Sequence, residues 1–247
     1  MSYIPNPHPN LASPTPNGQA RVDFLAWFNE GFVVTDGHLL ANPANPELIY
    51  TRLLPEAYTQ LPIKPVLAIM HTQAGNGKAS NDQVYGWLAR EDVKLEPHII
   101  GPEMVTGAML QVVPFDREAD CNLAANRFGV PGVGGQSVWA GAVSFEMQDL
   151  GGKTLDNTPM TERQLQSVVG LLTAACATYE IPCIAVPKTT QRTMWKGLSY
   201  HAKNGEWSAS SHSCPGASRI AQFPWVVHEV ATRLAHVYGA WGIGCPS

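Results

Sequence analysis

A short stretch late in the chain, Ser210–Gly216 (SSHSCPG), places the imidazole of His212 two residues before the thiol of Cys214. Pro215 follows the thiol directly, and a proline disfavours helix in the residue before it, so we expect Cys214 to lie on a fixed turn. A thiolate needs a cation nearby, which a bound metal supplies. The other interpretation is a surface histidine beside a thiol that only packs.

Two further imidazoles could complete a metal site with this thiol. His201 stands 13 residues before Cys214 in GLSYHAKNG, and His71 ends an apolar run in AIMHTQ, where its side chain would project from a sheet edge. Two histidines and one cysteine leave a fourth position open, as in catalytic zinc sites. Water there would have its pKa lowered from about 15.7 to about 7. The spacing fits no compact zinc-finger pattern, so by itself it does not decide between ligation and packing.

Composition excludes several classes of protein. The chain has 247 residues, 45% hydrophobic and only 15% charged, which predicts one sizeable core. We find neither a long apolar run nor the basic and apolar start of a secretory signal, so we expect no membrane insertion and no signal-directed export. The net charge of −4 with scattered Lys and Arg argues against a nucleic-acid partner. Five cysteines are too few and odd in number for a disulfide framework.

The elements that would position these residues can be predicted from periodicity. Short apolar or β-branched runs bounded by Gly or Pro predict strands at 66–71, 98–101, 109–113, 142–147 and 183–186. The capping-box pattern TERQ at 161–164 begins a predicted amphipathic helix with Cys176 on its apolar stripe, and apolar residues from 220 to 237 recur at helical spacing. We therefore predict an α/β fold with a single central mixed β-sheet flanked by helices.

The domain organisation predicted from composition has two parts. Residues 1–61 form an N-terminal extension, in which a proline-rich arm precedes a padding segment of a short helix and loops. Residues 62–240 form the domain that carries the chemistry. No internal repeats are present.

Residues 62 to about 235 resemble the zinc-dependent N-acetylmuramoyl-L-alanine amidases of phage lysins and peptidoglycan-recognition proteins, the type 2 amidases. The resemblance is carried, in chain order, by AIMHTQ, PHIIG with MLQVVPFD, AVSFEMQD, TERQLQSVVGLL and YHAKNG followed by HSCPG. It implies that His71, His201 and Cys214 bind Zn²⁺. It also implies that Glu146, the acid in the central strand, orients or deprotonates the attacking water and later protonates the leaving amine.

Two positions depart from the family pattern. Members commonly have Lys or Thr two residues before the last ligand, where this chain has His212. We expect His212 to stabilise the oxyanion as a donor, and a role as fourth ligand is the alternative. Some members place a catalytic Tyr before the strand histidine, where this chain has Pro97. We expect His98 to be a core or second-shell histidine rather than a ligand.

The resemblance implies a bacteriolytic, antimicrobial hydrolase. Its partner would be bacterial peptidoglycan, in which zinc-activated water cleaves the amide between N-acetylmuramic acid and L-alanine. We expect a monomeric endolysin that stays in the host cytoplasm until it reaches the cell wall. Two alternatives stay open at this point: a non-catalytic peptidoglycan-binding module on the same fold, and a zinc peptidase that cleaves the stem peptide.

Overall fold

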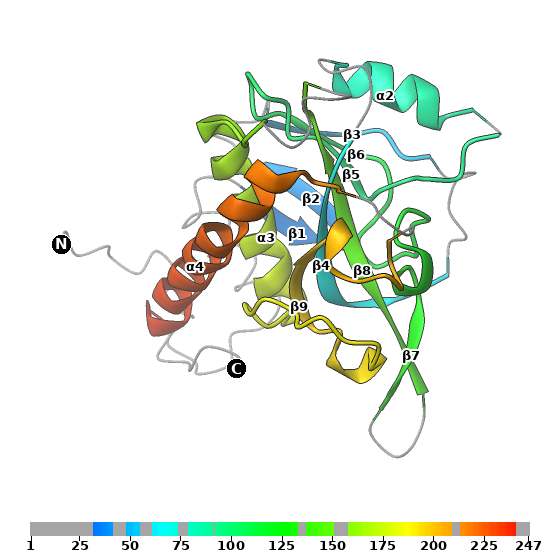
Figure 1. Cartoon of the computed structure of the whole chain (residues 1–247), viewed down its shortest axis with the longest axis vertical. Helices are drawn as coiled ribbons and strands as arrows, with labels where there is room; N and C mark the ends of the chain where they lie inside the picture. The colour runs from blue at the N-terminus through cyan, green and yellow to red at the C-terminus, as the bar shows by residue number, and fades with distance from the viewer. Residues whose placement is uncertain are drawn as a thin grey trace.

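The computed structural model describes residues 32–41, 48–54, 61–73, 79–90, 92–132, 137–150, 158–208 and 213–240 (Figure 1). Its centre is a mixed sheet of seven strands in the order β3-β6-β5-β8-β4-β9, with β7 paired to β8. The strands are β3 (Ile49–Thr51), β4 (Lys64–Thr72), β5 (Ile99–Ile100), β6 (Met109–Gln111), β7 (Phe128–Pro131), β8 (Ser137–Met147) and β9 (Gly197–Tyr200). Helices flank this sheet, so the predicted fold class is confirmed.

The two long strands at the middle of the sheet, β4 and β8, run parallel. Both are nearly continuous apolar runs, because strands buried on both faces need apolar side chains on both sides. From Leu67 to Met70 every side chain of β4 is at most 1% exposed. Parallel strands end at the same edge of a sheet, so residues at their carboxyl ends are brought together there.

Two long helices cover one face of the sheet, where Figure 1 shows them side by side: α3 (Glu162–Tyr179) and α4 (Ala217–Ala240). Helix α3 begins at the predicted capping box, because Thr161 accepts from the Gln164 backbone and the Gln164 side chain accepts in return. Cys176 is fully buried on its apolar face, as predicted. Helix α4 contains Pro224 in its interior.

The other face of the sheet carries a shorter helix, α2 (Asn81–Leu88), and the 3-10 turns η3 (Leu123–Ala125), η6 (Arg192–Met194) and η7 (His201–Lys203), set among irregular segments. Trp195 and Trp207 anchor this side, with ring centroids 5.0 Å apart in an edge-to-face arrangement. Both tryptophans are fully buried in a cluster with Leu67 and Ile69 of β4. Across the described residues, no helix is both long enough and apolar enough to cross a bilayer.

One predicted strand is wrong. Residues 183–186 form no strand and make only an isolated bridge between Ala185 and Leu198. Prolines stand on both sides of this run, at 182 and 187, and a proline cannot donate to a ladder. The place beside β4 is taken instead by β9, which the apolar pattern did not indicate.

The N-terminal region also differs from expectation. Instead of a short helix and loops, its described part contains an antiparallel hairpin of β1 (Phe32–Thr35) and β2 (His38–Ala41), followed by β3 at the edge of the sheet. Asp36 and Gly37 both have positive φ, 49° and 78°, which is the geometry of a tight two-residue hairpin turn. The hairpin shares a core with α3. The predicted arm lies outside the described residues.

Candidate metal centre

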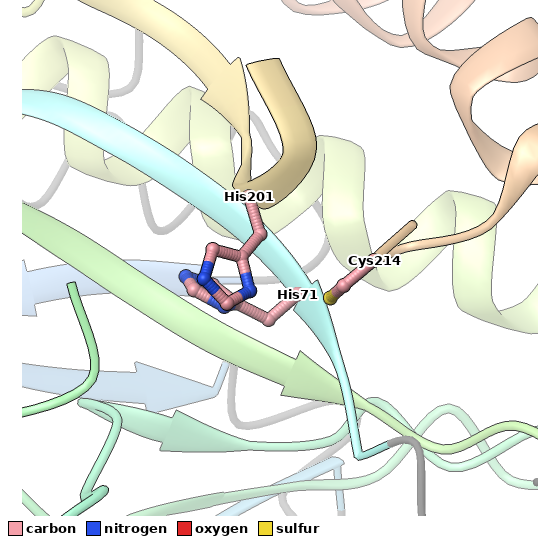
Figure 2. A group of neighbouring side chains, drawn as sticks. All are labelled: His71, His201 and Cys214. Carbon is pink, nitrogen blue, oxygen red and sulfur yellow. The ribbon is translucent and has the colours of Figure 1, made fainter. Parts of the chain in front are cut away.

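Three potential ligands converge at the carboxyl edge of the sheet. His71 lies at the end of β4, His201 begins η7 directly after β9, and Cys214 lies in the turn before α4. One ligand atom from each residue lies within 4.8 Å of the other two. Figure 2 shows the two imidazole rings close to each other with the thiol directed toward them. The structure therefore brings together the three residues that the sequence predicted as ligands.

Strand pairing explains why the two histidines meet. In the parallel pair of β4 and β9, Met70 is the register partner of Tyr200. A histidine follows each of these two residues along the chain, so both imidazoles lie at the same edge of the sheet. Their ring centroids are 4.3 Å apart. His71 is 1% exposed, whereas His201 is partly exposed.

Backbone contacts hold the cysteine turn against the other two ligands. The Thr72 backbone N–H donates to the Cys214 sulfur at 3.1 Å, and the Ala202 N–H donates to the Cys214 carbonyl at 2.8 Å. Burial raises the pKa of the Cys214 thiol to about 12, and the negative charge of Glu146 adds to this effect. A thiolate is therefore unfavourable here unless a cation binds beside it.

The His71 ring has a buried hydrogen-bond partner that sequence reasoning missed. Its Nε2 lies 2.7 Å from Oδ1 of Asn122, a fully buried residue at the start of η3. Its Nδ1 lies 3.6 Å from Oε1 of Glu146. The sequence holds no motif that would have paired Asn122 with His71, because the two residues are 51 positions apart.

Glu146 lies beside the three ligands, near the end of β8. Its side chain is 19% exposed, and its Oε2 is buried without a hydrogen-bond partner among the described residues. Burial, together with the negative charge of Asp149, raises its pKa to about 8. A cation bound by the neighbouring histidines and cysteine would act in the opposite direction and favour the carboxylate. Glu146 is therefore placed to exchange a proton with a molecule held at the site.

The donor set fits zinc. Imidazole nitrogen and thiolate sulfur are the ligands that Zn²⁺ prefers, and three protein donors are the usual number in a site that keeps a position open for water or substrate. Two of the three donor residues are buried, and the three ligand atoms lie close together. The fold therefore gathers the donors into one cluster, which a metal site requires.

The other residues singled out from the sequence lie elsewhere or cannot be placed. His212, the predicted oxyanion donor, falls in residues 209–212, outside the described residues. His98 is fully buried away from the three ligands, with Nε2 2.9 Å from the Arg117 carbonyl and Nδ1 3.1 Å from the Ser144 N–H. It is a core histidine, as expected.

A buried arginine, which sequence reasoning missed, stabilises the edge on which the site is built. Arg219, on the first turn of α4, donates through Nε to the Thr158 carbonyl at 2.9 Å and through Nη2 to the Gln148 carbonyl at 2.8 Å. Burial lowers the pKa of Arg219 to about 10, so the guanidinium stays charged at neutral pH. It ties the strand end that carries Glu146 to the helix that follows Cys214.

Comparison with known proteins gives likeness at the level of the fold. No protein-family profile matches the chain, and no curated protein matches its sequence. Among solved structures, the chain is similar to the endolysin N-acetylmuramoyl-L-alanine amidase LysCS from Clostridium intestinale URNW, at 13% identity and a TM-score of 0.49, over 74% of this chain and 94% of that chain.

Two further structures are similar over the same share of this chain. The catalytic domain of XlyA matches with 12% identity and a TM-score of 0.48, over 74% of this chain and 98% of that chain. PlyL matches with 15% identity and a TM-score of 0.47, over 74% of this chain and 94% of that chain. At these low identities, the three structures show similarity in fold alone.

Proposed function

We propose that the protein is a zinc-dependent N-acetylmuramoyl-L-alanine amidase that acts as an endolysin on bacterial peptidoglycan. The observation that carries the proposal is the convergence of His71, His201 and Cys214, with their ligand atoms within 4.8 Å, beside the carboxyl group of Glu146. The choice of substrate rests on the sequence motifs shared with type 2 amidases, which include all four of these residues.

His71, His201 and Cys214 would hold the metal. Bound Zn²⁺ supplies Lewis acidity, which polarises a carbonyl oxygen and lowers the pKa of water. The protein's own contribution is to keep the three donors in place. The Thr72 and Ala202 N–H groups fix the cysteine turn, and the register of β4 with β9 fixes the two histidines.

Glu146 would move the proton. As a carboxylate it accepts a proton from the water whose oxygen attacks the carbonyl carbon of the amide. When the carbon–nitrogen bond then breaks, the same carboxyl group gives this proton to the departing nitrogen. The products are the free carboxylate of the lactyl group and the free amine of L-alanine, so one water is consumed for each bond cleaved.

His212 would stabilise the oxyanion that develops on the carbonyl oxygen. Alternate residues of an extended segment share a face, so an extended chain before Cys214 would direct the His212 side chain to the side of that ligand. An imidazole N–H is a suitable donor for an oxyanion. The alternative, that His212 is a fourth ligand, would close the position that water or substrate needs.

The metal content of the purified protein tests the site. We expect about one Zn²⁺ per chain in the wild type and loss of most of it in Cys214→Ser. Cys183→Ser is the matched control, because Cys183 is a partly exposed thiol outside the three ligands and its loss should leave the zinc content unchanged. A Cys214→Ser protein that kept one zinc per chain would show that the ligand set is wrong.

The same variants separate catalysis from binding. An amidase loses lysis of labelled cell walls together with its zinc. A non-catalytic peptidoglycan-binding module would instead bind walls without releasing label, both with and without the metal.

A further inference from the structure

We propose that Asn122 is a positioning residue that holds His71 in its Nε2–H tautomer and so reserves Nδ1 of His71 for the metal. The proposal deepens the zinc site described above and rests on it. The tautomer itself, however, is a property of the metal-free protein and can be measured whether or not zinc binds.

The contact between the two side chains decides the tautomer. A neutral imidazole carries one N–H, and an amide oxygen can only accept. Oδ1 of Asn122 lies 2.7 Å from Nε2 of His71, so Nε2 must carry the hydrogen. The lone pair is then on Nδ1, which is the nitrogen on the side of Glu146, 3.6 Å from its Oε1. Asn122 is fully buried and His71 is 1% exposed, so water does not compete for this bond.

The backbone around Asn122 is built to hold its side chain still. The Asn122 N–H donates to Oδ1 of Asn126 at 2.6 Å, and the Ala125 N–H donates to the Asn122 carbonyl at 2.8 Å. These bonds close a tight turn in which Leu123 has a φ of 45°, a conformation that a residue other than glycine seldom adopts. The amide thus reaches His71 from a rigid support rather than from a loose loop.

The side-chain amide of Asn122 also has an unsatisfied hydrogen-bond donor. Nδ2 of Asn122 is buried and has no hydrogen-bond partner among the described residues. An unpaired buried donor destabilises a fold, so a purely structural position would favour an apolar residue of similar size. Among the described residues, the Asn122 side chain bonds only to His71. An asparagine at this position is explained if that bond matters for the ligand.

The physical consequence of losing the amide follows from this geometry. Without an acceptor at Nε2, the ring can place its hydrogen on Nδ1 and donate toward Glu146, which removes the lone pair from Nδ1. Partners of ligand histidines are typically worth about 10- to 100-fold in metal affinity. We expect a loss of that size when Asn122 cannot accept.

Three variants test the proposal. Asn122→Leu removes the acceptor at similar volume, and Asn122→Asp keeps an oxygen acceptor in its place. Asn81→Leu is the matched control: Asn81 is also fully buried, also has an unpaired amide atom, and bonds to the Ala108 carbonyl rather than to a ligand. Nitrogen-15 NMR of the His71 ring in metal-free protein gives the tautomer, and competition with a chelator gives the zinc affinity.

We expect the Nε2–H form in the wild type, in Asn122→Asp and in Asn81→Leu, all with zinc affinity within about threefold of one another. Asn122→Leu should populate the Nδ1–H form and bind zinc about 10- to 100-fold more weakly. A wild-type ring in the Nδ1–H form would overturn the proposal, even if Asn122→Leu did not fold. An Asn122→Leu protein with unchanged tautomer and affinity would overturn it as well. A wild type that showed the Nε2–H form but bound no zinc would contradict the metal site and leave the tautomer assignment intact.

Discussion

His71 and Glu146 are register partners on the neighbouring parallel strands β4 and β8, and their side chains approach to 3.6 Å between Nδ1 and Oε1. A potential metal ligand and a potential proton carrier are thus fixed by the same ladder of backbone hydrogen bonds. Neither can shift along its strand without breaking the pairing of the two longest strands in the sheet. The distance between His71 and Glu146 is therefore set by the strand pairing in the core of the sheet and does not depend on a loop.

The first prediction concerns this carboxyl group. Glu146→Gln should retain zinc and the fold, because the amide has nearly the same shape and Glu146 is not one of the three ligands. The rate of wall lysis should fall by about two to four decades, since the amide cannot accept or return the proton. Lysis of labelled walls at equal zinc content measures it.

Glu162→Gln is the control, because Glu162 is an exposed carboxylate on the first turn of α3. It should leave both readouts unchanged. Full activity in Glu146→Gln would assign the proton transfer to another group.

The second prediction concerns His212. If it donates to the oxyanion, His212→Ala should keep its zinc and lose turnover by about 10²- to 10³-fold, the usual effect of removing one such donor. His212→Lys should recover part of that loss, since an ammonium group donates equally well. Measured zinc content separates this role from ligation, because a fourth ligand would weaken metal binding when removed. An intact zinc site in His212→Lys with no more activity than His212→Ala argues against the oxyanion role.

The third prediction concerns the stability of the fold in acid. Burial lowers the pKa of His98 from 6.5 to about 4. Protonation would also set Nδ1–H against the Ser144 N–H that now donates to it. Between these two pH values the unfolded chain binds a proton that the folded chain does not. His98 therefore contributes stability that is complete above pH 6.5 and is lost as the pH falls toward 4, by about 3 kcal/mol in total.

Other groups titrate in the same range, so the test compares variants. Urea unfolding of the wild type and of His98→Gln at pH 7 and pH 4 should show a difference in unfolding free energy that shrinks by about 3 kcal/mol at the lower pH. His228→Gln, which changes an exposed histidine on α4, should show no such change. A difference for His98→Gln that stayed constant with pH would show that His98 titrates normally in the folded protein.

The sequence predicted the central elements because their signals are local. The apolar runs of β4 and β8 and the capping box at Thr161 are complete within a few residues. The run at 183–186 misled because apolar composition alone does not show that flanking prolines prevent a ladder. The hairpin of β1 and β2 had a signal that was not used: Asp36-Gly37 between two apolar runs is a typical two-residue turn.

For the site, residue type and motif were enough to propose His71, His201, Cys214 and Glu146, since each lies at the end of a strand or in a marked turn. Asn122 and Arg219 could not be predicted in this way. Both act through hydrogen bonds between segments far apart in the sequence, and their neighbours along the chain show nothing distinctive. Such partners emerge only when the packing of irregular segments against the sheet is known.

The bond that the protein cleaves tests the central claim most directly. Purified peptidoglycan fragments should be incubated with the zinc-loaded protein and with the same protein after chelation, and the products analysed by mass spectrometry. We predict one new free L-alanine amine and one free lactyl carboxyl group per cleavage, both dependent on zinc and both lost in Cys214→Ser. Cleavage within the stem peptide, or equal release of these products by the chelated protein, would contradict the assignment as a zinc-dependent amidase.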